Sequence, residues 1–197
     1  MRYLPTGNWM QKADAHTIHE IGIPSLVLME RAALGIAEVI KSKVLKNKKI
    51  LIVCGSGNNG GDGFAIARLL HDENYSVGIA FVGKTESMSD ECKQQYCICK
   101  NIGISIETEI PDEEYGVIVD AIFGVGLCRE ISGKYASVIE CLNAMKGYKV
   151  AVDIPSGVSS LDGKILGIAF KADLTVSVQC EKLGTVLYPG KDFAGEV

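Results

Sequence analysis

The sequence lacks a long apolar run, an excess of basic residues and a signal-like N-terminus. No stretch of about 18 consecutive apolar residues occurs, which excludes a transmembrane helix. The N-terminal segment MRYLPTGNWMQKAD has no apolar core of the kind found in secretory signals. The net charge is −4 and the isoelectric point is near 5.4, whereas nucleic-acid binding requires a basic surface. We therefore expect neither a membrane nor a nucleic-acid partner.

The cysteines also lack the pattern of a disulfide framework. There are seven, an odd number, and none of them forms a C-x-x-C motif. Scattered thiols of this kind are typical of a reducing compartment, so we expect a cytoplasmic protein. With 197 residues, of which 47% are hydrophobic, the chain is long enough to bury the core of one domain.

The apolar pattern changes character near residue 49. Before it, the spacing predicts a helix that Thr6 caps and that runs through Glu20, then a second helix over 25–46 that starts after Pro24. After it, short Val/Ile/Leu runs alternate with amphipathic stretches. Strands are expected at 49–55, 76–83, 104–108, 116–124, 148–157 and 172–178, and helices at 61–73, 87–101 and 134–146. This alternation predicts an α/β fold, Rossmann-like and doubly wound, with a mainly parallel sheet and an N-terminal helical extension.

Three polar loops follow buried strands of this sheet directly. They are CGSGNNGGDG (54–63), DAIFGVGL (120–127) and DIPSG (153–157). Because ligands of open parallel sheets bind beyond the carboxyl ends of the strands, we expect the three loops to meet at one edge. Asp120 and Asp153 each end an apolar strand, where a carboxylate needs a partner. The simpler alternative is that these aspartates cap helices or tie loops together.

The first loop has the G-x-G-x-x-G spacing of a dinucleotide-binding turn, at Gly55, Gly57 and Gly60. A dehydrogenase of this type carries an acidic ribose-binding residue at the end of the next strand, but residues 82–84 are Val-Gly-Lys. Asp62, which we expect in the first turn of the following helix, would repel a pyrophosphate. A conventional NAD dehydrogenase is therefore disfavoured, and the absence of G-K-[ST] excludes a P-loop.

The motifs GNNGGDG, VDAIFGVGL and VDIPSG, in this order, resemble the YjeF N-terminal domain family, the NAD(P)H-hydrate epimerases. The segments IPSLVLMERAA and ADLTVSVQCEKLGTVLYPGKDFAGEV are similar to that family too, so the likeness covers nearly the whole chain. The resemblance implies an isomerase that interconverts the R and S forms of hydrated NADH and NADPH (NADHX and NADPHX), which carry a hydroxyl on C6 of the nicotinamide ring. The nucleotide would then be a damaged substrate under repair and not a hydride carrier.

The resemblance also implies a set of ligand contacts. The expected substrate-binding residues are Asn58, Asn59, Gly60, Gly61, Asp62, Gly124, Val125, Gly126, Leu127, Cys128, Arg129, Glu130 and Asp153. A potassium ion is expected on Asn59, Asp120 and Ser156. Carboxylate, amide and hydroxyl oxygens suit a hard cation, which would also offset the charge of Asp120. For Ser156, a plain turn role after Pro155 is the alternative.

Inverting C6 requires a proton to move on and off oxygen. Asp153 is the first candidate for this general acid/base role, and Lys182, which matches a family lysine, is the second. An ordinary surface lysine is the alternative for Lys182.

Further expectations from the resemblance concern assembly. The family members pair through their N-terminal helices, which implies a homodimer, and they work with or are fused to an NAD(P)HX dehydratase. The family continues through one more strand after the position of Val197, so we expect the domain over 1–197 to be truncated at its C-terminus, as the N-terminal part of a bifunctional protein would be.

A non-catalytic module that binds a nucleotide or a protein is the main alternative function. Some proteins with this domain act in RNA decapping or bind lipoprotein partners, with an altered pocket. The presence of Asn59, Asp62, Asp120 and Asp153 favours the enzyme.

Overall fold

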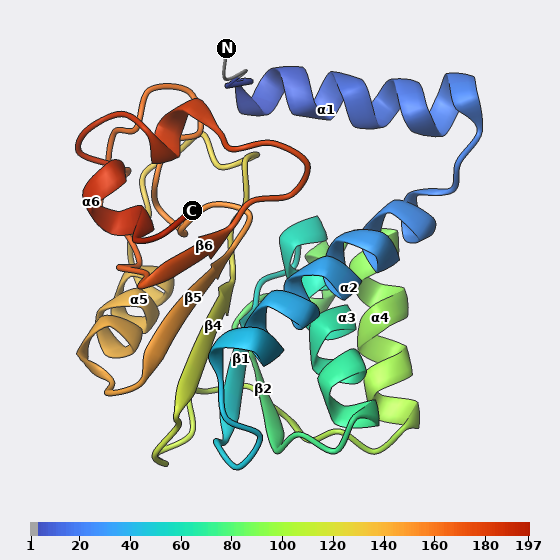
Figure 1. The fold of residues 1–197 in the computed structure, drawn as a ribbon, viewed down its shortest axis with the longest axis vertical. Helices are drawn as coiled ribbons and strands as arrows, with labels where there is room; N and C mark the ends of the chain where they lie inside the picture. Colours follow the sequence, from blue (N-terminus) through green and yellow to red (C-terminus); the bar gives the residue numbers. More distant parts are fainter. Residues whose placement is uncertain (1–3) are drawn as a thin grey trace.

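The computed structural model describes residues 4–197 and contains one six-stranded, all-parallel sheet in the order β3-β2-β1-β4-β5-β6 (Figure 1). The strand order reverses between β1 and β4, which is the switch point of a doubly wound sheet. Every residue of these two central strands is buried, as expected for strands covered on both faces. The strands are β1 Ile50–Cys54, β2 Val77–Phe81, β3 Ile106–Glu107, β4 Val117–Ala121, β5 Tyr148–Val152 and β6 Leu174–Val176.

Helices cover both faces of the sheet. On one face α2, α3 and α4 pack side by side, and α5 lies on the other (Figure 1). The first helix, α1, extends across the carboxyl edge of the sheet, apart from the other helices. The helices are α1 Gly7–His16, α2 Ser25–Lys43, α3 Asn58–Asp72, α4 Asp90–Asn101, α5 Lys134–Ala144 and the short α6 Lys191–Ala194. A π-helical turn spans Thr17–Ile21, and 3-10 turns span Thr85–Ser87 and Leu183–Thr185.

The structure confirms the predicted fold class and every expected helix and strand, and most of these elements are shorter than expected. The first helix does start at a Thr6 cap, whose hydroxyl accepts the Trp9 N–H at 3.4 Å. It gives way to the π-helical turn after His16, and that turn ends at Gly22, whose φ of +85° favours glycine. The predicted strand at 148–157 stops at Val152, so that its polar end belongs to the edge loops.

One prediction about the first loop is wrong. The helix that follows β1 starts at Asn58 and not at residue 61, because the Gly61 N–H already donates to the Gly57 carbonyl at 3.1 Å. Asn58 and Asn59 therefore form the first turn of α3. Asp62 lies one turn further along, beyond the reach of the helix N-terminus as an anion site.

All seven cysteines are free thiols, as expected. No helix within residues 4–197 is long and apolar enough to cross a bilayer.

Candidate active site

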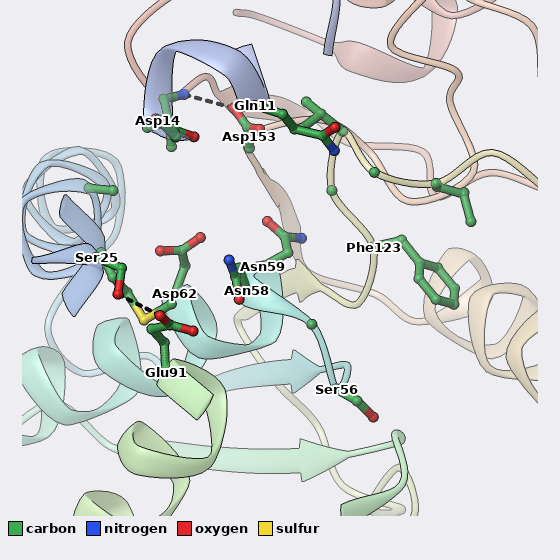
Figure 2. Close-up of a pocket in the computed structure, with 18 of the residues that line it drawn as sticks. Gln11, Asp14, Ser25, Ser56, Asn58, Asn59, Asp62, Glu91, Phe123 and Asp153 are labelled. Carbon is green, nitrogen blue, oxygen red and sulfur yellow. Dashed lines mark hydrogen bonds between the residues drawn. The ribbon is translucent and has the colours of Figure 1, made fainter. Parts of the chain in front are cut away.

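A cavity of about 1070 Å³ opens at the switch point of the sheet. Its walls come from the loops that follow β1, β4, β5 and β6, from the first turns of α2, α3 and α4, and from α1, which crosses above (Figure 2). The three polar loops do meet at one edge, as the order of the strands requires. Sites of about 300–1000 Å³ hold small molecules, so this cavity is large enough for a dinucleotide.

The predicted site residues fall into two groups. Asn58, Asn59, Asp62, the loop 124–129 and Asp153 line the cavity. Asp120, Ser156 and Lys182 are buried and, like Gly60, Gly61 and Glu130, are not among the residues that line it.

Gly60 and Gly61 serve the packing of α3. A Cβ on Gly60 would lie 2.0 Å from the Gly55 carbonyl oxygen, and one on Gly61 would lie 2.6 Å from Cε of Met29. The absence of side chains lets α3 start against its own loop and against α2. These glycines place Asn58, Asn59 and Asp62 at the cavity.

Gly60→Ala is therefore expected to lower the free energy of unfolding by about 2–3 kcal/mol, because the new methyl group meets a buried backbone carbonyl that cannot move aside. Urea denaturation measures the change. Gly57→Ala is the matched control: it lies three residues away, its Cβ would meet nothing within 4 Å, and it should cost less than about 1 kcal/mol. Equal losses in the two variants would contradict the packing role.

Asp120 ties the end of β4 to the loop that follows β5. Its side chain accepts the Ser156 hydroxyl at 2.6 Å, the Ser156 N–H at 2.8 Å and the Ile122 N–H at 3.1 Å. Asp120 is fully buried, and this burial raises the pKa of its carboxyl to about 6, against the lowering effect of the Ser156 hydrogen bonds. Asp120 therefore ties two loops together, as the simpler alternative predicts. It is also a buried acidic group that has no ion-pair partner among residues 4–197.

Asn59 reaches the same loops from α3. It is 8% exposed, and its side chain lies against the position of Gly124 in the loop after β4. Its Nδ2 has no hydrogen-bond partner within the part of the chain that the structure describes. A buried amide of this kind is costly unless a ligand satisfies it.

Asp153 and Lys182 form a buried ion pair at the cavity wall. The Lys182 ammonium contacts Asp153 Oδ1 and donates to the Val178 carbonyl at 2.7 Å. Lys182 is 1% exposed, so the alternative of an ordinary surface lysine is wrong.

The backbone of Asp153 is held in an uncommon conformation. Its φ is +69°, in the left-handed region, and its Oδ1 also accepts the Val178 N–H at 2.9 Å. Strained non-glycine residues of this kind cluster at functional sites. Both contacts use Oδ1, so Oδ2 is the oxygen available to a ligand in the cavity.

Two further carboxyl groups at the cavity had no signal in the sequence. Asp14 comes from α1, and Glu91 comes from α4, where it accepts a hydrogen bond from Ser25 (Figure 2). Asp14 sits within an ordinary amphipathic helix, and only the placement of α1 over the sheet edge brings it to the site.

The switch-point cavity and the strained, lysine-paired aspartate define a Rossmann-like α/β protein with a polar, carboxylate-lined cavity at the carboxyl edge of its sheet. The family model described as YjeF-related protein N-terminus matches residues 25–184, and the chain belongs to this family. The matched range includes the three loops and Lys182 but not Asp14.

Relatives and a solved structure agree with this assignment. The chain is 44% identical over 195 residues to a protein of Limosilactobacillus fermentum, covering 98% of this chain and 93% of that protein. It is 42% identical over 186 residues to one of Oenococcus oeni, covering 93% and 89%. Both are named NAD(P)H-hydrate epimerase. The crystal structure of yeast ynu0, YNL200c, has a TM-score of 0.84 at 21% identity and covers 93% of this chain and 83% of its own; this likeness concerns the fold.

Proposed function

We propose that this protein is an NAD(P)H-hydrate epimerase, which interconverts the R and S forms of NADHX and NADPHX in nicotinamide nucleotide repair. The observation that carries the proposal is Asp153, which lines a dinucleotide-sized cavity and is paired with the buried Lys182. The epimerase name of relatives that match 93–98% of the chain supports it.

The reaction needs a proton-transfer group next to C6 of the nicotinamide ring. The hydroxyl on C6 is lost as water, or the ring opens to an aldehyde, and either route moves a proton on and off oxygen. Asp153 is suited to this role because Oδ1 is anchored by Lys182 and Val178 while Oδ2 stays available. The nicotinamide end of the substrate is accordingly assigned to the Asp153 end of the cavity.

A coupled assay tests the activity. R and S forms of NADPHX are mixed with a dehydratase specific for S, and the disappearance of R is followed with and without this protein in potassium buffer. Acceleration above the spontaneous rate supports the epimerase. No acceleration by folded protein would overturn the proposal and would favour a non-catalytic nucleotide- or protein-binding module.

We also propose a potassium ion held by Asn59, Asp120 and Ser156. These residues fit the ion: Asp120 offers a buried carboxylate, Ser156 a hydroxyl already in contact with it, and Asn59 an amide without a partner. Because amide nitrogen and oxygen positions are assigned and not observed, rotation of the Asn59 amide would present Oδ1 to the ion. A bound ion would supply a positive charge beside Asp120 and join the first turn of α3 to the loops after β4 and β5.

Potassium is therefore expected to stabilise the folded protein. At a concentration about 100 times Kd, binding adds about 2.7 kcal/mol, or roughly 5–10 °C in Tm for a chain of this size. The measurement is Tm in potassium chloride against tetramethylammonium chloride at equal ionic strength. The difference should vanish in Asp120→Asn and persist in Asp72→Asn, a change at the exposed end of α3. An equal Tm of the wild type in both salts would rule out the site.

A homodimer, cooperation with an S-specific dehydratase and a cytoplasmic location stay predictions from the resemblance and the free cysteines. Exposed apolar side chains at the N-terminal end support the dimer. They are Trp9, Ile21, Val27 and Leu34.

A further inference from the structure

Three carboxyl groups from separate elements are directed toward the same space at one end of the cavity (Figure 2). Asp14 comes from α1, Asp62 from α3 and Asp153 from the loop after β5. Only Asp153 touches a cation, Lys182; neither Asp14 nor Asp62 has an ion-pair partner within residues 4–197. The three groups therefore have different electrostatic surroundings in one site.

Asp62 is the group least able to carry a negative charge. Burial, followed by the negative charges of Asp153 and Asp14, raises the pKa of its carboxyl well above the usual range, and Lys182 opposes the shift only weakly. The pKa of Asp14 is raised as well, first by burial and then by Asp153. Asp62 and Asp153 therefore differ in their surroundings, since only Asp153 is paired with a cation. Two carboxyl groups that differ in this way can serve as acid and base in one reaction.

The remaining groups near Asp62 do not compete for this proton. Burial raises the pKa of the Cys92 thiol to about 12 and that of Cys54 well above its usual range, so both thiols stay neutral. Glu91 is engaged by Ser25. Arg31 lines the cavity from α2, but no ion pair joins it to Asp62 within the described residues.

We propose that Asp62 is a second catalytic residue, the proton donor that acts together with Asp153 as the base. This inference rests on the proposed epimerase function and adds a role for a residue otherwise expected only to bind substrate. Asn59 supports it, because its unpartnered amide lines the same cavity one helical turn before Asp62 and offers the substrate a further polar contact.

The proton transfers balance without another reactant. The Asp153 carboxylate takes the proton of the C6 hydroxyl, the C6–oxygen bond becomes a carbonyl, and the C6–N1 bond breaks with its electron pair going to N1. Asp62 gives its proton to N1. After rotation about the C5–C6 bond, N1 returns its proton to Asp62 and adds to the other face of the aldehyde, while Asp153 returns its proton to oxygen. Each residue ends in the state in which it began.

The test compares Asp62→Asn with Asp72→Asn, a matched change on the same helix. In the coupled NADPHX assay, Asp62→Asn should lower kcat about 100-fold or more with little change in KM, and Asp72→Asn should leave kcat unchanged. Because the donor must be protonated, wild-type activity should fall as pH rises through the pKa of Asp62. That alkaline fall should be absent from the residual activity of Asp62→Asn. If Asp62 had only a structural role, the Asp62→Asn variant would keep the alkaline fall in activity.

Two further measurements separate folding and proton state from chemistry. Asp62→Asn removes a half-buried acidic group whose surroundings disfavour its charge, so its Tm at pH 7 should equal or exceed that of the wild type. The infrared carbonyl band of the protonated Asp62 carboxyl should persist to a higher pH than that of an exposed aspartate in the wild type and in Asp72→Asn, and this component should be absent from Asp62→Asn. An Asp62→Asn variant with wild-type kcat, or one that keeps the alkaline fall, would overturn the inference while the epimerase stands. A wild type without activity would overturn the proposed function itself.

Discussion

Asp153→Asn is expected to lower kcat for epimerisation about 1000-fold, which is the largest effect of any single change on activity. The asparagine amide keeps the shape of the carboxylate and can still accept the Val178 N–H, but it cannot take a proton from the C6 hydroxyl. Asparagine also tolerates the φ of +69° at this position better than alanine does, so the loop should keep its conformation. The measurement is the rate of R-NADPHX loss at saturating substrate.

The control must allow for Lys182, which Asp153→Asn leaves buried without a counter-charge. The double variant Asp153→Asn/Lys182→Met removes both charges and should recover most of the lost stability but none of the activity. Activity in the double variant within tenfold of the wild type would show that Asp153 is not the base. If the variants lost activity only in proportion to the loss of folded protein, the activity of each folded molecule would be unchanged, and Asp153 would again not be the base.

The sheet could be predicted from the sequence because the apolar pattern that indicates each strand lies within a few consecutive residues. A run such as ILIVC must be buried on both faces wherever it lies, and this alone indicates a central strand of a parallel sheet. The polar loops that follow such runs must then meet at the carboxyl edge, and Asn59, Asp62 and Asp153 do line one cavity there. The start of α3 was misplaced by three residues because the two glycines that pack it, Gly60 and Gly61, have no periodic apolar pattern.

The electrostatics of the site could not be predicted in this way. Lys182 lies in a segment with little regular structure, where no periodicity distinguishes a buried lysine from a surface one. Its burial depends on how that segment packs against Asp153 and Ser160 in the loop after β5. Asp14 reaches the cavity only through the tertiary placement of α1. The raised pKa of Asp62 could not be predicted either, since it depends first on burial and then on the charges of Asp153, Asp14 and Lys182.

Lys182→Met is expected to lower the free energy of unfolding by about 3–5 kcal/mol, the largest single effect on stability. Methionine matches the length of the lysine stem and fills the same buried space, so the loss comes from the charge. The change leaves the Asp153 carboxylate without its counter-charge and the Val178 carbonyl without a donor. For a chain of this size the Tm should fall by about 10 °C, measured by calorimetry at pH 7.

A double-mutant cycle separates the ion pair from packing. If the cost of Lys182→Met is electrostatic, the Asp153→Asn/Lys182→Met variant should be more stable than either single variant, because neither charge is then left buried alone. If the cost comes from packing, the two single losses should add. Lys43→Met removes a lysine whose partner, Glu196, is exposed, and should change stability by less than about 1 kcal/mol. Additive losses would mean that Lys182 stabilises the protein through packing, and that it does not influence the charge that Asp153 presents to the C6 hydroxyl.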